Sequence, residues 1–217
     1  MSNPDTADSD GTSVPEYERV DVSVLVVGAG AAGARTAIEL AERGVDDVLV
    51  LGKRNHGDAH TTWARGGING ALGTHDPDDS WAIHAADTLN EGHFVNDPQK
   101  VETVTRQMPD RLRELDDWGM DFSRTDDGEI DQRFFGAQSF RRTAFAGDHT
   151  GESMLKALVD RARELSVPYR ENVLITKLLS DGDECYGAVG FDMDSGEFVL
   201  VNAGTVVLAA GGYAAAY

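Results

Sequence analysis

The sequence predicts an α/β fold, in which a parallel sheet built on a βαβ unit is joined by an antiparallel β-meander. An apolar, β-branched run at 22–27 has the length of a buried strand and leads directly into a glycine-rich turn at 28–33. Residues 32–43 then have apolar positions at helical spacing and end before Gly44, and 48–51 form a second apolar strand. Near the carboxyl end, short apolar runs alternate with Asp–Gly and Ser–Gly turns, which is typical of a meander.

The rest of the chain supplies helices between these two groups of strands. Residues 52–79 are rich in Gly, His, Asp and Thr and are expected to form a loop. Asn96 or Asp97 is expected to cap a helix that has Pro98 in its first turn, and Gly119 marks its end. The expected elements are helices at 80–89, 98–118 and 151–165, an irregular segment at 121–150, and strands at 173–179, 185–192, 197–201 and 205–209.

Composition narrows the class of protein. The chain has 217 residues and no apolar run near the roughly 20 residues of a membrane span, so direct membrane insertion is not expected. Its acidic, polar start does not resemble a signal peptide, which favours a cytoplasmic protein. Cys185 is the single cysteine, so neither an internal disulfide nor a multi-cysteine metal cluster can form, and no metal site is expected.

The net charge of the chain limits the binding partners that we expect. The chain has 38 acidic against 19 basic residues, a net charge of −19, and only four lysines. So acidic a surface repels duplex DNA and suits a salt-rich, halophilic cytoplasm, where salt screens the self-repulsion. An ordinary acidic protein is the alternative. Residues 1–19 are polar and acidic and are expected to form a disordered tail, and 20–217 are expected to form one domain.

The turn at 28–33 has the spacing of a dinucleotide fingerprint, G-x-G-x-x-G. Gly28 permits the tight turn, Gly30 lets the backbone approach a pyrophosphate, and Gly33 lets the helix pack on the strand. The helix start supplies amides and a positive dipole end to the phosphates. The predicted binding residues here are Gly28, Ala29, Gly30, Ala31, Ala32 and Gly33.

The end of the second strand departs from that pattern. An acid is expected there to bind the ribose, but the chain has Gly52, Lys53 and Arg54. Two bases would suit the 2′-phosphate of NADP, and a solvated basic pair is the other interpretation. Downstream, Gly66, Gly67 and Gly70 suit a loop that lies flat against a planar ligand.

These motifs together resemble the amino-terminal portion of the flavoprotein subunits of succinate dehydrogenases and fumarate reductases, a group that includes L-aspartate oxidase. The segment from His60 to Gly67, the run at 118–124, the run at 133–138, Arg142-Thr143, the run at 148–151 and the run at 206–213 all follow the family order. The resemblance covers about residues 21–217 and implies a Rossmann-like FAD-binding fold.

The resemblance implies a set of site residues. In the respiratory enzymes, the histidine matching His60 carries a covalent bond to FAD. Phe135 and Gly67 are expected on the substrate side. The other implied FAD contacts are Gly52, Lys53, Thr61, Ala64, Arg65, Gly66, Val173, Leu174, Ala210 and Gly211. Arg65 replaces the family's usual Glu or Gln; it either stabilises an anionic reduced flavin or is a salt-bridged structural residue.

The resemblance also implies an activity and partners. The family interconverts succinate and fumarate by hydride transfer with flavin, and its electrons leave through an iron–sulfur partner, which can also associate it with a membrane. The capping domain and the proton-shuttle arginine are expected beyond Tyr217, so no catalytic residue is assigned here. Two alternatives remain: a truncated, non-catalytic FAD-binding module, and an L-aspartate oxidase-like flavoenzyme, which Trp63 favours and His60 opposes.

Overall fold

The computed structural model describes residues 16–213, and they divide into two compact units. The first unit combines residues up to His56 with those from Leu165 onward, and the second unit is Gly57–Glu164. Most of the expected acidic tail, residues 1–15, lies outside the described residues.

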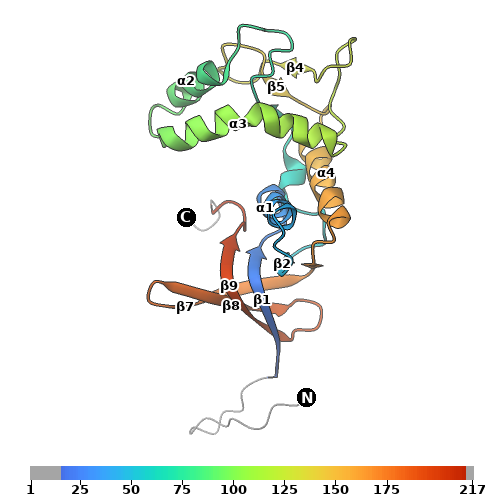
Figure 1. Cartoon of the computed structure of the whole chain (residues 1–217), viewed down its shortest axis with the longest axis vertical. Coiled ribbons are helices and arrows are strands. Elements are labelled where there is room, and N and C mark those ends of the chain that lie inside the picture. The colour runs from blue at the N-terminus through green and yellow to red at the C-terminus, as the bar shows by residue number, and fades with distance from the viewer. Residues whose placement is uncertain (1–15, 214–217) are drawn as a thin grey trace. The chain divides into compact units, whose positions relative to one another are not determined.

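The first unit is built on one six-stranded sheet in the order β6-β2-β1-β9-β8-β7 (Figure 1). The first four strands in this order are parallel, and β8 and β7 continue the sheet as an antiparallel meander. One helix, α1 (Ala31–Glu42), connects β1 to β2. The strands are β1 (Tyr17–Val27), β2 (Val48–Leu51), β6 (Tyr169–Arg170), β7 (Val173–Asp181), β8 (Glu184–Asp192) and β9 (Phe198–Leu208).

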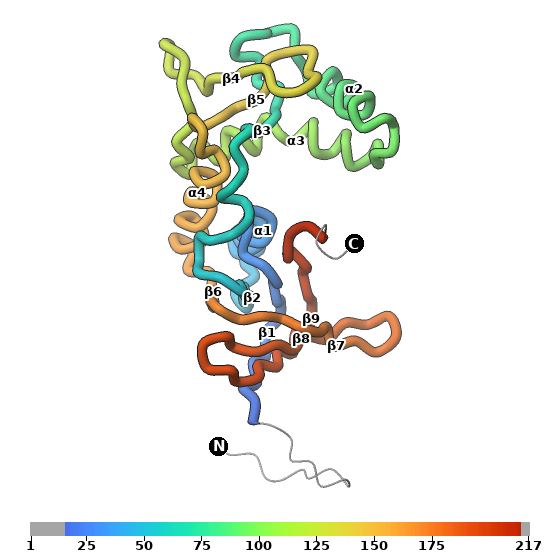
Figure 2. The backbone as a smooth tube through the Cα atoms, turned by 180° about the vertical axis from the view of Figure 1, so that it is seen from behind, coloured from blue at the N-terminus to red at the C-terminus, as the bar shows by residue number. Residues whose placement is uncertain are grey.

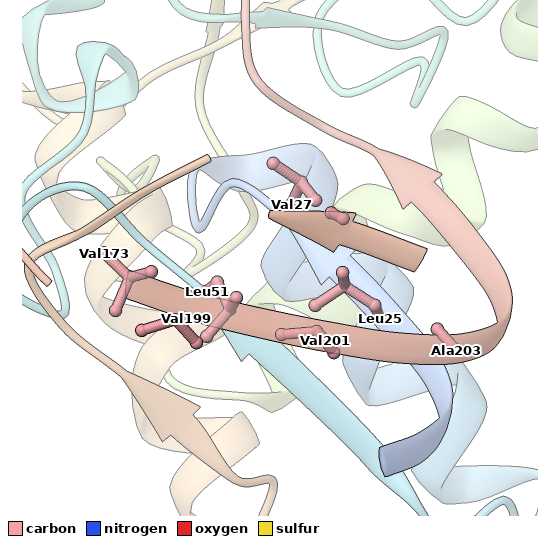
Figure 3. Packing of buried hydrophobic residues seen from close by; sticks show 8 residues of the cluster. Leu25, Val27, Leu51, Val173, Val199, Val201 and Ala203 are labelled. Carbon is pink, nitrogen blue, oxygen red and sulfur yellow. The ribbon is translucent and has the colours of Figure 1, made fainter. Parts of the chain in front are cut away.

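The apolar run at the end of β1 faces two hydrophobic clusters. Leu25 and Val27 lie on one face of the sheet, in a cluster with side chains from β2, β7 and β9 (Figure 3). Val26 points to the other face and packs with Ala37 of α1 and Val50 of β2. Successive side chains of a strand alternate between faces, and here both faces are covered. This explains why the run is continuously apolar rather than alternating.

Two strand predictions were wrong in extent. β1 begins at Tyr17, which pairs with Phe198, so residues 17–19 belong to the sheet and not to a disordered tail. The strands predicted at 197–201 and 205–209 are one strand, β9, paired with β1 along its length. The β1–β9 register is the same on both sides of Gly204, since Val22 pairs with Ala203 and Val24 with Thr205, so this glycine does not end the strand.

The second unit contains the three predicted helices and a small antiparallel sheet. The helices are α2 (Trp81–Glu91), α3 (Pro98–Asp117) and α4 (Thr150–Glu164), and α2 packs against α3. The sheet has the order β3-β5-β4, formed by Ile68–Asn69, Thr143–Ala144 and Gln132–Arg133. Asp97 caps α3, where its carboxylate accepts hydrogen bonds from the amides of Gln99 and Lys100, which confirms the predicted start.

A buried arginine joins the loops of this unit. The side chain of Arg142 is 0% exposed and forms a bidentate ion pair with Asp79, in which Nε lies 3.0 Å and Nη2 lies 2.8 Å from the two carboxylate oxygens. Its Nη1 donates to Asp87 of α2 at 2.7 Å. Asp87 in turn accepts hydrogen bonds from the amide and the hydroxyl of Ser139. Asp79 and Asp87 lie 63 and 55 residues from Arg142 in the sequence, so two distant segments of the chain meet at one guanidinium.

Substitution of Arg142 by Met is expected to lower the free energy of unfolding by about 3–5 kcal/mol, because it leaves the buried Asp79 carboxylate without its partner. Chemical denaturation measures the loss. The control is Arg113→Met, which removes an exposed pair with Asp110 and should change stability little. Equal effects of the two substitutions would contradict the structural role given to Arg142.

His84 should make stability pH-dependent in mildly acidic solution. Burial, and then the Arg142 guanidinium, lower the pKa of His84 below its usual value, although Asp79 and Asp87 oppose the shift. The unfolded chain therefore binds a proton more readily than the folded one, so stability is complete above about pH 6.5 and falls as the pH drops below it. Unfolding curves between about pH 7 and pH 5 should show this slope, and His84→Leu should flatten it. A substitution of the exposed His93 by Asn should leave the slope intact.

Candidate functional site

The fingerprint residues of the first unit form a turn with almost no space for side chains. Gly28 follows β1 with φ +106°, a conformation that favours glycine, and its amide donates to Leu51 O at 2.8 Å. A Cβ at Gly28 would overlap the carbonyl oxygen of Ala209, and a Cβ at Gly33 would overlap that of Gly28. The start of α1 therefore lies close against the turn, as the fingerprint predicts.

The amino end of α1 suits an anionic group. Gly30 is the N-cap residue and has no side chain with which to cap the first amides. Helix amides with no capping side chain, together with the helix dipole, favour a phosphate at this position. Ala210, which follows β9, lies beside the turn: its nitrogen is 3.0 Å from the position of a Gly28 Cβ. The structure thus places the predicted residues 28–33 and Ala210 together, and their geometry fits a pyrophosphate.

The carboxyl end of β2 meets the start of β7. The amide of Gly52 donates to Arg170 O, and Gly52 O accepts from the amide of Val173, both at 3.0 Å. Val173 is buried, and Lys53 is exposed. The predicted residues Gly52 and Val173 are therefore joined by a backbone hydrogen bond, with Lys53 and Leu174 adjacent to them in the chain.

The predicted His60 segment belongs to the second unit. His60–Trp63 form a short 3-10 helix, η1, and the side chains of His60 and Trp63 are exposed. The segment runs along α4 (Figure 2). The amide of Gly151 donates to Ala64 O at 2.8 Å, and a Cβ at Gly151 would overlap the carbonyl oxygen of Thr61. The backbone of η1 is thus fixed against the start of α4.

The loop after η1 is held by two arginines. Arg65 Nη1 donates to Asp148 O at 2.7 Å, which favours the structural interpretation of this residue, through a carbonyl rather than a salt bridge. Arg133 Nη2 donates to Gly66 O at 3.1 Å and Arg65 O at 3.4 Å, and its guanidinium lies 4.3 Å from the centre of the Phe145 ring. The sequence marked Arg133 only as part of a motif, because its partners lie 67 and 68 residues away.

Positions 66 and 67 both favour glycine, but for different reasons. A Cβ at Gly66 would lie 3.0 Å from Cζ of Phe135, so this ring rests against the loop. Gly67 has φ +117°, and its Cβ would overlap Thr143 and Ala144 of β5. The structure therefore brings the predicted substrate-side residues Phe135 and Gly67 into one neighbourhood, with Phe135 56% exposed.

Residues 16–213 contain neither a candidate metal site nor a candidate membrane-spanning helix. No group of three or more His, Cys, Asp or Glu side chains there is arranged to hold a metal ion. In the same part of the chain, no helix combines the length and the apolar character that crossing a membrane requires.

Comparison with known proteins defines the class. The FAD binding domain family matches residues 23–217. One chain of the fumarate reductase (CoM/CoB) of Methanothermobacter marburgensis is 38% identical over 91% of this chain and 36% of its own length. A mitochondrial succinate dehydrogenase flavoprotein of Xenopus laevis is 35% identical over 97% of this chain and 32% of its own length. The Sdh1 complex of Mycobacterium smegmatis has a chain that superposes with a TM-score of 0.85 at 38% identity, covering 90% of this chain and 35% of that one.

The fold and the glycine geometry therefore define an FAD-binding domain of the α/β class. The chain belongs to the FAD binding domain family, whose members named above are succinate dehydrogenase and fumarate reductase flavoproteins, FAD-dependent oxidoreductases. It spans about a third of the length of these relatives. The NADP interpretation of Lys53 and Arg54 is accordingly set aside.

Gly28→Ala should abolish FAD binding and destabilise the fold, because it combines an unfavourable φ with a backbone overlap at Ala209. Gly44→Ala is the matched control: Gly44 has φ +79° but no atom within 4 Å of its Cβ position, so only the conformational cost of about 1–2 kcal/mol applies. Denaturant unfolding and titration with FAD measure the two effects. Similar losses in both variants would show that the close approach at Gly28 does not matter.

Proposed function

We propose that this chain is the FAD-binding portion of an enzyme that interconverts succinate and fumarate, with FAD attached covalently to His60. The observation that carries the proposal is the placement of His60: it is exposed on η1, shortly before a glycine pair whose loop is fixed by Arg133 and Phe135. An exposed imidazole on a fixed backbone is accessible to a flavin.

Specific roles follow for the residues described above. Gly28, Ala29, Gly30, Ala31, Ala32 and Gly33 bind the pyrophosphate, with Ala210 and Gly211 beside them. Gly52, Lys53, Val173 and Leu174 meet the adenosine half. Thr61, Ala64, Arg65, Gly66 and Gly67 meet the flavin ring, and Phe135 with Gly67 faces the dicarboxylate. The names of the relatives, a succinate dehydrogenase and a fumarate reductase, support this choice of substrate.

The reaction requires a hydride acceptor and a base. In the oxidation of succinate, bound FAD would supply the acceptor for a hydride from one methylene carbon, and a base would take a proton from the other, which would leave the double bond of fumarate. The residues described here serve the hydride half, since they orient the cofactor. Electrons then pass to an iron–sulfur subunit, through which the protein associates with a membrane complex; the relatives are themselves named as subunits.

Two alternatives have different outcomes in solution. An L-aspartate oxidase-like enzyme is favoured by Trp63, whose side chain is 68% exposed on η1, and it would bind FAD without a covalent bond. A non-catalytic FAD-binding module would bind the cofactor and leave succinate unchanged.

The net charge of −19 fits a salt-rich cytoplasm, because salt screens the repulsion between acidic side chains. An increase in the stability of the protein in concentrated salt would support that setting.

Precipitation of the flavin-loaded protein with acid tests the attachment to His60. We expect yellow colour and flavin fluorescence to stay with the denatured wild-type chain, and to be released from His60→Ser. The control is His93→Asn, a substitution of another exposed histidine, which should retain attached flavin. Release from the wild type would reject the covalent bond and favour the oxidase-like alternative. Succinate-dependent reduction of a dye by the 217-residue chain would exclude the non-catalytic module.

A further inference from the structure

The end of β2 lacks the group that usually binds a ribose. In dinucleotide-binding folds of this class, a carboxylate about 20 residues beyond the last fingerprint glycine accepts a hydrogen bond from the ribose 2′-hydroxyl. In this chain, position 52 lies 19 residues after Gly33, and it is a glycine followed by Lys53 and Arg54. No carboxylate is therefore available from this segment.

A tyrosine from another strand takes up the space at position 52. A Cβ built on Gly52 would overlap the hydroxyl oxygen of Tyr169 and would lie 2.9 Å from its Cζ. Tyr169 belongs to β6, where it pairs with Val50 of β2, and its ring packs against the hydrophobic cluster around Val26. Strand pairing and packing therefore fix the ring, so that its hydroxyl lies where the side chain of residue 52 would begin.

The turn after β2 is built around the same tyrosine. The Tyr169 hydroxyl donates to Arg54 O at 2.8 Å. The ring of His56 stacks on the Tyr169 ring with centroids 4.0 Å apart and planes 19° apart. The amide of His56 donates to the Glu171 carboxylate at 2.8 Å. Gly52, Arg54 and His56 thus all contact Tyr169, and these contacts fix the position of the Tyr169 hydroxyl.

We propose that Tyr169 replaces the missing carboxylate, its hydroxyl oxygen accepting a hydrogen bond from the 2′-hydroxyl of the adenosine ribose of FAD. A phenol oxygen that donates one hydrogen bond keeps lone pairs with which to accept another. The assignment rests on the proposed placement of the adenosine half at the end of β2.

The test compares FAD with an analogue that has 2′-deoxyribose in its adenosine half. All proteins carry His60→Ser, which keeps binding reversible, and affinity is measured by equilibrium titration of flavin fluorescence. The parent should bind FAD about three- to tenfold more tightly than the deoxy analogue, the value of one hydrogen bond. Tyr169→Phe should bind both with the weaker affinity, so that the ratio falls to about one. Tyr186→Phe, which alters a half-exposed tyrosine of β8, should keep the parental ratio.

Each outcome is decisive. A Tyr169→Phe protein that still prefers FAD by the parental ratio overturns the assignment, because a role confined to the Arg54 carbonyl would weaken both ligands equally. A parent that binds FAD without preferring it over the deoxy analogue also overturns it, while leaving the proposed function intact. A parent that binds neither ligand rejects the proposed function itself. Thermal unfolding of each variant confirms that a changed ratio does not arise from unfolding.

Discussion

The second unit depends on the buried guanidinium of Arg142. This unit has little regular sheet, since each of its three strands has two residues, so the course of its loops is set by side chains. Arg142 draws together Asp79, which precedes α2, and Asp87 within α2, and it lies next to β5 in the chain. β5 in turn pairs with β3, directly after Gly67, and with β4, directly before Phe134. The buried Arg142 ion pairs therefore anchor β5, which pairs with the strands next to Gly67 and Phe134.

In the first unit, the corresponding constraint is close approach of backbone atoms. Gly28, Gly33 and Gly52 each lie where a Cβ would overlap another atom: a carbonyl oxygen of Ala209, a carbonyl oxygen of Gly28 and the hydroxyl of Tyr169. Each glycine thus brings a polar atom of the protein close to the carboxyl ends of the parallel strands. In open α/β sheets this is the edge where ligands bind. The polar atoms that these three glycines bring to that edge are two backbone carbonyl oxygens and one phenol oxygen.

The sequence predicted the elements whose signals are local and missed those that depend on distant partners. Gly44 ends α1, and Asp97 with Pro98 starts α3, so both helices were predicted within a residue or two. The start of β1 at Tyr17 could not be predicted, because it depends on pairing with Phe198. The same holds at the site. The fingerprint is contiguous and was recognised, whereas Arg133 and Tyr169 act on backbone 67 and 115 residues away.

The His60 segment combines an exposed side chain with a backbone held at several points. The amide of Gly151 binds Ala64 O, Arg133 binds Gly66 O, and Phe135 rests on Gly66. Arg65 is engaged with Asp148 O, so its guanidinium contributes to the same anchoring. A flavin bonded to His60 and lying on the glycine pair would meet a surface that is already formed, and little conformational entropy would be lost on binding. The bond proposed at His60 would then form on a loop that the protein itself holds in place, whereas a mobile loop would have to be ordered by the cofactor.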